Sequence, residues 1–144
     1  MARVVSKGLH RAEQVLKPHG LTTTQYNVLR ILNGAEPDGL CGTEIGDRLL
    51  AQVPDVTRLL DRIAAAGLIV RERDPNNRRF VTARLTDAGR AKLLETTPLL
   101  DAVHRGQFRR FSAEQLETLR ELVALIVDPT VSDPSPLRPG KAAV

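Results

Sequence analysis

The stretch QVPDVTRLLDRIAAAGLIVRERDPNNRRFVTARLT, residues 52–86, decides the fold. Its pattern predicts a helix, then a strand, an arginine-bearing turn and a returning strand. From Arg58 to Lys92 there are nine basic residues against four acidic ones, whereas the rest of the chain has 12 basic and 13 acidic residues. A short segment with this charge favours a polyanionic partner, and nucleic acid is the commonest one.

The helix is predicted over residues 52–66, with Pro54 in its first turn, where the missing N–H costs little, and Gly67 as its stop. Spacings of three and four residues divide this helix into two faces. The inner face is expected to contain Val56, Leu60, Ile63 and Ala64, and the outer face Asp55, Arg58 and Arg62. The outer face is therefore the charged one.

The two strands are predicted over residues 68–73 and 80–85, joined by the turn Asp74–Asn77. Alternation places Leu68 and Val70 of the first strand on the inner face, together with Ala83 and Leu85 of the second. The hairpin should therefore carry Arg78 and Arg79 near its tip.

The remaining segments predict further helices. An amphipathic helix is expected over residues 2–17, and Thr22 with Gln25 forms the capping-box pattern of a second helix. A short helix should run from residue 41 or 42 to 50. A long helix after Thr86 should bend or break at Pro98, and the last helix should begin after Ser112. Residues 128–144 are rich in proline and are expected to form a flexible tail.

Composition excludes several classes of protein. The 144 residues, 42% of them hydrophobic, correspond to about one globular domain. The sequence contains no run long and apolar enough for a membrane span and no signal-peptide pattern, so a cytoplasmic protein without membrane contact is expected. One cysteine and three scattered histidines predict no metal and no cofactor. No catalytic constellation is recognisable, so we do not expect an enzyme.

The order of these elements indicates a mainly α fold with a small β-hairpin wing, a winged helix-turn-helix. In such a fold the second helix of the pair can lie in the major groove, and the hairpin reaches an adjacent groove or the backbone. Arginine suits both positions, because its planar fork binds guanine in the major groove and also enters narrow minor grooves.

The segments TEIGDRLL, VTRLLDRIAAAGLIVRERDPNNRRFV and LTDAGRAKL resemble the helix, recognition helix, wing and post-wing helix of the MarR (multiple antibiotic resistance regulator) family. The resemblance covers about residues 5–127. It implies one domain over residues 1–127, with a DNA-binding part at 21–97 and dimerisation helices at 1–20 and 98–127. It also implies a homodimer that binds a pseudo-palindromic operator in double-stranded DNA. Such a protein is commonly a repressor relieved by a small, often phenolic, effector.

Two departures from the family pattern affect the expected DNA contacts. The wing of the family commonly carries Asp-x-Arg, whereas this chain has Asn77 before Arg78 and Arg79. Asn77 lacks the charge that would hold a neighbouring arginine in place. Val53 and Pro54 stand where many relatives have polar or basic residues, which predicts the loss of one contact.

The candidate DNA-binding residues come from the short helix, the recognition helix with its approach, and the wing. They are Thr43, Gln52, Pro54, Asp55, Thr57, Arg58, Arg62, Arg73, Asn77, Arg78 and Arg79. Three of them have open alternatives. Asp55 either accepts a hydrogen bond from cytosine N4 or caps the recognition helix. Arg62 contacts DNA, or Arg62 and Asp61 pair locally or with wing arginines, and Thr43 contacts a phosphate or is an ordinary polar residue.

The candidate effector-binding residues are the polar groups of the expected dimer helices, His10, Gln14, Tyr26 and His104. Each of them could equally have a structural hydrogen bond. Cys41 precedes the short helix, where a reactive thiol would make a redox-responsive regulator, or it simply fills a turn. A winged-helix module that binds another protein is the remaining alternative, and the basic reading face argues against it.

Overall fold

A computed structural model describes residues 2–73 and 81–124 of the chain. The predicted turn, the wing-tip residues Asn77, Arg78 and Arg79, and the predicted tail lie outside the described residues. The chain divides into two compact units, Met1–His104 and Arg105–Val144. The first unit contains the helix and the two strands that the charged stretch predicts.

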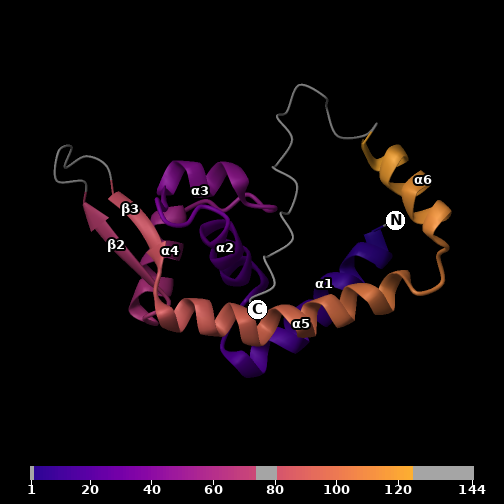
Figure 1. The fold of residues 1–144 in the computed structure, drawn as a ribbon, viewed down its shortest axis with the longest axis horizontal. Coiled ribbons are helices and arrows are strands. Elements are labelled where there is room, and N and C mark those ends of the chain that lie inside the picture. The colour runs from indigo at the N-terminus through magenta and orange to yellow at the C-terminus, as the bar shows by residue number, and fades with distance from the viewer. Residues whose placement is uncertain (1, 74–80, 125–144) are drawn as a thin grey trace. The chain divides into compact units, whose positions relative to one another are not determined.

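The first unit contains a helical core and a small sheet. Its helices are α1 (Ala2–Leu16), the short 3-10 helix η1 (Lys17–His19), α2 (Thr23–Asn33), α3 (Gly42–Arg48), α4 (Val56–Ala65) and most of α5 (Asp87–Phe108). Its strands are β1 (Leu40–Cys41), β2 (Ile69–Arg73) and β3 (Val81–Leu85). Figure 1 shows the two longer strands side by side next to α4.

The core of the first unit forms where α2 meets the neighbouring helices and the sheet. Val28, Leu29 and Ile45 are fully buried, and Leu60 and Ile63 of α4 pack with them. The capping box of α2 is confirmed, because the Gln25 backbone N–H donates to Thr22 Oγ1 at 3.1 Å and the Thr22 N–H donates to Gln25 Oε1 at 2.9 Å. The predicted start of this helix was therefore correct.

The sheet has three antiparallel strands in the order β1-β3-β2. In the register, Ile69 lies opposite Leu85 and Arg71 lies opposite Ala83. The predicted phase of the first strand was wrong, since Ile69 is buried and Val70 is 38% exposed. Three consecutive apolar residues begin this segment, so their pattern could not determine which of them points inward. Strand β1 was not predicted, because two residues are too short for a periodic pattern.

Helix α4 begins at Val56, four residues later than predicted. Asp55 occupies the N-cap position, because its Oδ1 accepts a hydrogen bond from the backbone N–H of Arg58 at 2.9 Å. Pro54 consequently lies before the helix and not in its first turn. Leu59 is buried and belongs to the inner face with Leu60 and Ile63, whereas Val56 and Ala64 are partly buried against the same core.

A compact joint connects α4, the sheet and α5. The Thr86 hydroxyl donates to the Gly67 carbonyl at 2.7 Å and accepts from the Gly89 backbone N–H at 3.0 Å. A Cβ on Gly89 would overlap the carbonyl oxygen of Leu68. Close packing at this joint therefore requires Thr86 and Gly89, the threonine and glycine of the segment LTDAG.

Helix α5 continues through Pro98, so the predicted break does not occur. Proline removes the backbone hydrogen bond to the carbonyl of Leu94. Leu94 and Pro98 are both exposed, and a carbonyl on the solvent side of a helix can bind water instead. One residue earlier, the Thr97 hydroxyl donates to the Leu93 carbonyl at 2.7 Å.

The second unit contains the end of α5 and helix α6 (Ala113–Ala124). Its predicted capping box is confirmed, because the Ser112 N–H donates to Gln115 Oε1 at 2.9 Å and the Gln115 N–H donates to Ser112 Oγ at 3.2 Å. Phe108 and Phe111 pack edge to face, with ring centroids 6.1 Å apart.

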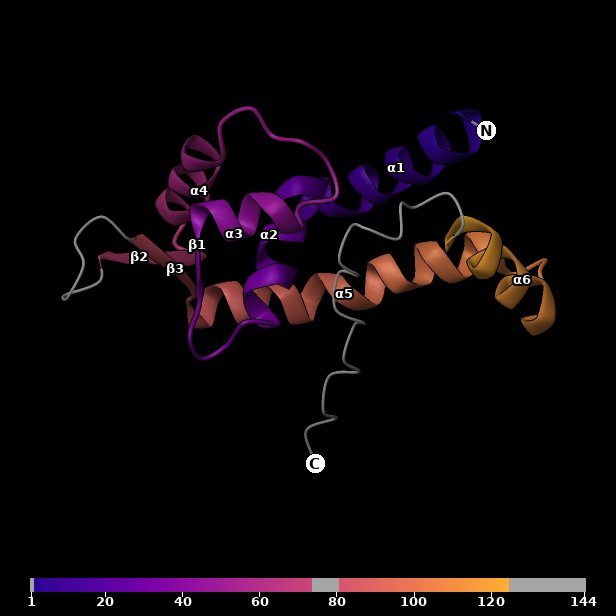
Figure 2. The same ribbon diagram turned by 90° about the horizontal axis from the view of Figure 1, so that it is seen from above.

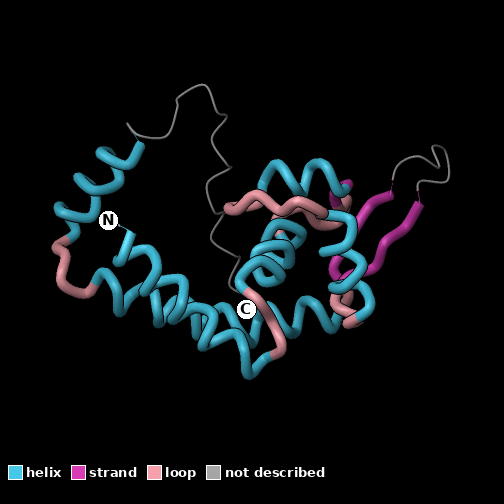
Figure 3. Tube along the Cα trace, turned by 180° about the vertical axis from the view of Figure 1, so that it is seen from behind, coloured by secondary structure: helices cyan, strands magenta, loops and turns pink. Residues whose placement is uncertain are grey.

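Two other views show how the first unit presents α4. Figure 2 shows α3 next to α4 and the hairpin strands beside them. In Figure 3 the hairpin strands, in magenta, project from the helical part of the first unit. The winged helix-turn-helix order predicted from the sequence is therefore the observed one.

Candidate nucleic-acid interface

The outer face of α4 is the centre of the candidate interface. Thr57, Arg58 and Arg62 are all exposed on this helix, as predicted. Arg62 Nε donates a long hydrogen bond of 3.4 Å to the carbonyl of Arg58, one turn earlier. Asp55 caps the helix, so the structural alternative for this residue holds in the described chain. The face thus presents two guanidinium groups and a hydroxyl.

Most of the other basic residues near α4 are neutralised by acids. Arg71 forms an ion pair with Asp61, Arg84 pairs with Glu72 at 3.0 Å, and Lys92 pairs with Glu95 at 3.0 Å. Arg90 pairs with both Glu36 and Asp87. Arg58 and Arg62 have no carboxylate partner within residues 2–73 and 81–124. Among the described basic residues from α4 to the start of α5, those without a described ion pair are therefore Arg58 and Arg62 of α4 and Arg73 at the end of β2.

The other predicted DNA-binding residues surround α4. Gln52 and Pro54 are exposed in the loop between α3 and α4. Thr43 is exposed in the first turn of α3, and Arg73 is exposed at the end of β2. Arg73 and Thr43 thus lie on β2 and α3, the elements that follow and precede α4 in the chain.

One relevant pair was foreseen only in part, because pairing of Asp61 with wing arginines was one of the open alternatives and Arg71 was not singled out as its partner. The Asp61–Arg71 ion pair links α4 to β2, and only the correct strand phase places Arg71 on the same side of the sheet as Ile69. An acid within a basic helix face, followed by an arginine in the next strand, was the available signal.

Cys41 caps α3 together with Glu44. The Cys41 backbone N–H donates to Glu44 Oε2 at 2.8 Å. Hydrogen bonds from the backbone and then from the thiol of Cys41 hold the pKa of the Glu44 carboxyl below its ordinary value. The backbone N–H and the thiol of Cys41 are thus both engaged with Glu44 at the start of α3. The geometry favours the structural alternative for Cys41.

The four predicted effector-binding residues do not converge. His10 and Gln14 share a hydrogen bond of 3.0 Å along α1. Tyr26 is buried, and its hydroxyl lies 3.1 Å from Thr97 Oγ1. Because that threonine donates its only proton to Leu93, Tyr26 is the donor in this pair. His104 is exposed near the end of the first unit.

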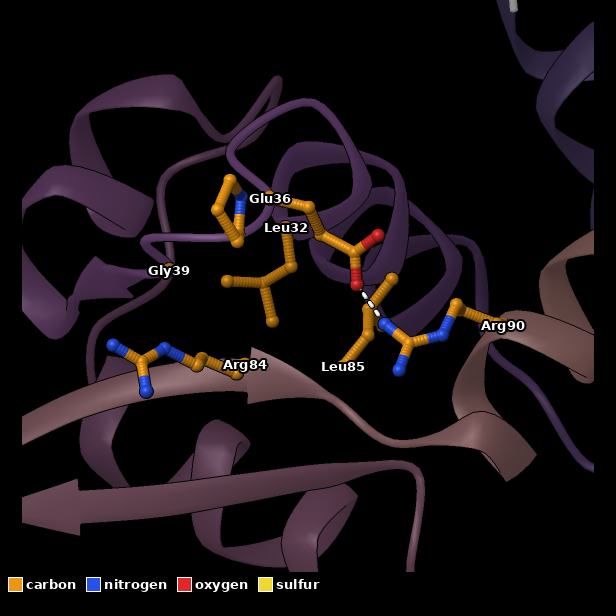
Figure 4. A pocket seen from close by; sticks show the side chains of 7 residues that line it. Leu32, Glu36, Gly39, Arg84, Leu85 and Arg90 are labelled. Atoms are coloured by element: carbon orange, nitrogen blue, oxygen red, sulfur yellow. Dashed lines mark hydrogen bonds and ion pairs between the residues drawn. The ribbon is translucent and has the colours of Figure 1, made fainter.

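A hollow of about 260 Å³ lies between the α2–β1 loop, β3 and the start of α5. Figure 4 shows Leu32 and Leu85 within it and the Arg90–Glu36 ion pair at one side. None of the predicted effector-binding residues lines this hollow. Both of its arginines already have acidic partners, so it offers no unpaired charge for a ligand.

The comparisons with known proteins agree with this geometry. The MarR family model matches residues 19–79, which include α2, α3, α4 and β2. A crystal structure of a MarR transcription factor from Planctomyces limnophilus is 36% identical, with a TM-score of 0.67 over 85% of this chain and 89% of that one. The chain belongs to the MarR family.

Two further relatives extend the MarR assignment. The HTH-type transcriptional regulator YkoM of Bacillus subtilis is 39% identical over 83 residues, which are 58% of this chain and 53% of that protein. The chain therefore spans about half the length of this relative. A mutant MarR from E. coli, whose crystal structure is a complex with operator DNA, is 25% identical with a TM-score of 0.78. That match covers 88% of this chain and 89% of that chain.

The described residues contain no cluster of three or more His, Cys, Asp or Glu side chains that could hold a metal ion. No helix within the same residues is long and apolar enough to cross a membrane. The MarR-family relatives named above are transcription regulators.

Proposed function

We propose that this chain is a sequence-specific transcriptional regulator that binds a pseudo-palindromic operator in double-stranded DNA as a homodimer. The observation that carries the proposal is the charge on α4. Arg58 and Arg62 lie exposed without a described carboxylate partner, as does Arg73 at the end of β2, while Arg71, Arg84 and Arg90 are paired with acids. The mutant MarR from E. coli, with a similar fold, was crystallised with operator DNA.

We assign the roles in this complex by position. Thr57 and Arg58, in the first turn of α4, read base edges in the major groove. Arg62, one turn later, and Thr43, in the first turn of α3, contact phosphates. Asp55 supports this helix as its cap and does not read a base.

The flanking residues complete the proposed interface. Gln52 and Pro54 in the loop before α4 lie against the DNA backbone, and Arg73 at the end of β2 leads into the wing. Asn77, Arg78 and Arg79, which lie outside the described residues, reach the minor groove. This division follows the usual separation between contacts that position the protein and contacts that specify the sequence.

Dimerisation through the terminal helices is supported by apolar residues that each unit leaves exposed. In the first unit they are Leu9 of α1 with Leu94 and Leu99 of α5, and in the second Phe108, Phe111, Leu116, Leu122 and Val123. Exposed apolar surface of this extent marks an interaction site. We therefore keep residues 1–20 and 98–127 as dimerisation segments of one domain, with 21–97 as the DNA-binding part.

The proposed regulator is cytoplasmic and is a repressor that a small phenolic effector relieves. His10, Gln14, Tyr26 and His104 remain the candidate effector contacts, because they belong to α1, α2 and α5, which flank the DNA-binding part. Binding of an effector would change the separation of the two copies of α4, which must match half-sites about one DNA turn apart.

Selection of duplexes from a random library tests the proposal. The expected result is enrichment of an inverted repeat whose two halves are bound by two copies of the chain. Binding to the selected duplex should weaken steeply as salt rises, because phosphate contacts release counterions. Recovery of no preferred sequence, with binding that does not respond to salt, would favour a winged-helix module that binds a protein.

A further inference from the structure

The ion pair between Asp61 and Arg71 joins the reading helix to the wing strand. Arg71 Nη1 donates to Asp61 Oδ1, so the contact connects α4 directly to β2. The Arg71 side chain is 24% exposed, whereas that of Asp61 is 60% exposed. The pair therefore extends from the inner side of the sheet to the surface beside α4.

Arg71 is confined by the register of the sheet. It lies opposite Ala83, which is buried, and it shares its side of β2 with the buried Ile69. A guanidinium group in such a place requires a partner, because burial of an unpaired charge is strongly unfavourable. Its Nε is buried and has no hydrogen-bond partner within the described part of the chain. Asp61 is therefore the described group that compensates the charge of Arg71.

Asp61 occupies an unusual place for an acid. It lies three residues after Arg58 and directly before Arg62, on the helix that would approach phosphates. An uncompensated carboxylate there would repel DNA. Pairing with Arg71 offsets its charge and ties α4 to β2, the strand that ends at Arg73.

We propose that Arg71 is a positioning residue for DNA binding, which acts through Asp61 to hold the wing strand at a set angle to the recognition helix. This inference rests on the proposed function. Arg71 then contributes no DNA contact of its own, although the sequence places it within the basic segment. The Asp61–Arg71 pair thereby holds α4 and β2 together as one rigid DNA-binding unit.

The effect of Asp61→Asn distinguishes positioning from simple charge. Removing a negative charge from a DNA-binding surface should strengthen binding if the carboxylate acts only through its field. If the ion pair positions β2, Asp61→Asn should instead weaken binding, by roughly threefold to tenfold. Asp47→Asn is the matched control, because Asp47 is an exposed acid of α3 with no described ion pair.

The probe is the duplex that the wild-type protein selects, and binding is measured at several salt concentrations. Arg71→Gln and the double variant Asp61→Asn/Arg71→Gln should weaken binding about as much as Asp61→Asn alone, since all three remove the same contact. Each should also reduce the slope of log affinity against log salt by about one, as a displaced strand loses a phosphate contact. The exchanged pair Asp61→Arg/Arg71→Asp should recover binding.

Two results would overturn the inference. One is stronger binding by Asp61→Asn, equal to that of Asp47→Asn, and the other is an unchanged salt slope in Arg71→Gln. Thermal unfolding of each variant identifies any loss of fold, which lowers the active fraction without changing the slope. A wild-type protein that selects no duplex would refute the proposed function itself, whereas either result above would leave it intact.

Discussion

Asp55 and Arg58 are joined by a hydrogen bond of 2.9 Å from the backbone N–H of the arginine to the carboxylate of the aspartate. The bond satisfies one of the free N–H groups at the start of α4 and places Arg58 in the first helical turn. An acid at this end of a helix is also favoured by the helix dipole. The same bond thus stabilises the reading helix and orients its first arginine.

Asp55→Ala should destabilise the protein by about 1 kcal/mol, because it removes this cap. Asp55→Asn, which keeps an oxygen acceptor, should lose much less. Urea denaturation measures the free energy of unfolding of both variants. An Asp55→Ala protein of wild-type stability that prefers a different base at one operator position would instead assign Asp55 to cytosine recognition.

Two glycines of α5 should respond to alanine in opposite directions. Gly89→Ala should cost about 2 kcal/mol or more, since its Cβ would overlap the backbone of Leu68. Gly106 has open space around its Cβ position, so Gly106→Ala should stabilise the helix by about 0.5–1 kcal/mol. Thermal unfolding of the two variants checks both signs. A stable Gly89→Ala protein would contradict the close packing of the joint.

Arg58→Ala and Arg79→Ala should affect DNA binding differently. Arg58→Ala should reduce discrimination at one base pair by about 1–3 kcal/mol. Arg79→Ala should weaken binding to all duplexes more evenly. Competition binding with single-base operator variants measures this difference. Arg120→Ala is the control, because Arg120 lies on α6 and pairs with Glu117 at 2.7 Å. Affinity unchanged by both test substitutions would be incompatible with the proposed interface.

The folding stability of the protein should depend on pH in the acidic range because of Glu95. Hydrogen bonds from Lys92 and then His19 hold the pKa of the Glu95 carboxyl below its ordinary value of 4.5. Because the pKa of Glu95 is lower in the folded state, its hydrogen bonds stabilise the folded protein at pH values above the ordinary pKa. This stabilisation is lost as the pH falls through the folded-state pKa. Unfolding midpoints measured from neutral pH into this acidic range should therefore fall less for Glu95→Gln than for the wild type. Asp101→Asn, which removes an exposed acid without a described ion pair, should behave as the wild type does.

Cys41→Ser should leave operator binding unchanged before and after treatment with peroxide. Serine keeps a side-chain donor beside Glu44 and is itself a favoured N-cap residue. Binding by the wild type should also resist peroxide, because Cys41 is engaged in the cap of α3. Peroxide sensitivity of the wild type that is absent from Cys41→Ser would establish the redox-responsive alternative.

The sequence was sufficient where local chemistry determines the structure. The capping boxes at Thr22 and Ser112 follow from neighbouring residues alone, and both are observed. The order of the helices and the hairpin also follows from patterns within short windows. The predicted exposure of Arg58 and Arg62 on α4 is also observed, and their role in DNA binding remains a proposal.

The predictions from the sequence were wrong where contacts between residues far apart in the chain determine the structure. Ile69 and not Val70 is buried, because the register with β3 places Ile69 opposite Leu85. Proline within α5 is tolerated because Leu94 and Pro98 lie on an exposed side of that helix. The choice of Arg71 as the partner of Asp61 depends on the packing of α4 against β2 and on the strand phase, which the sequence pattern left open.

The most direct test of the reading face is the affinity of wild-type and Arg58→Ala proteins for the selected inverted repeat, compared with a scrambled duplex of the same length. We predict that the wild type prefers the repeat by at least about a thousandfold at physiological salt. Arg58→Ala should lose roughly tenfold or more of that preference while it keeps most of its affinity for the scrambled duplex. Equal affinity of the wild type for both duplexes would contradict the account.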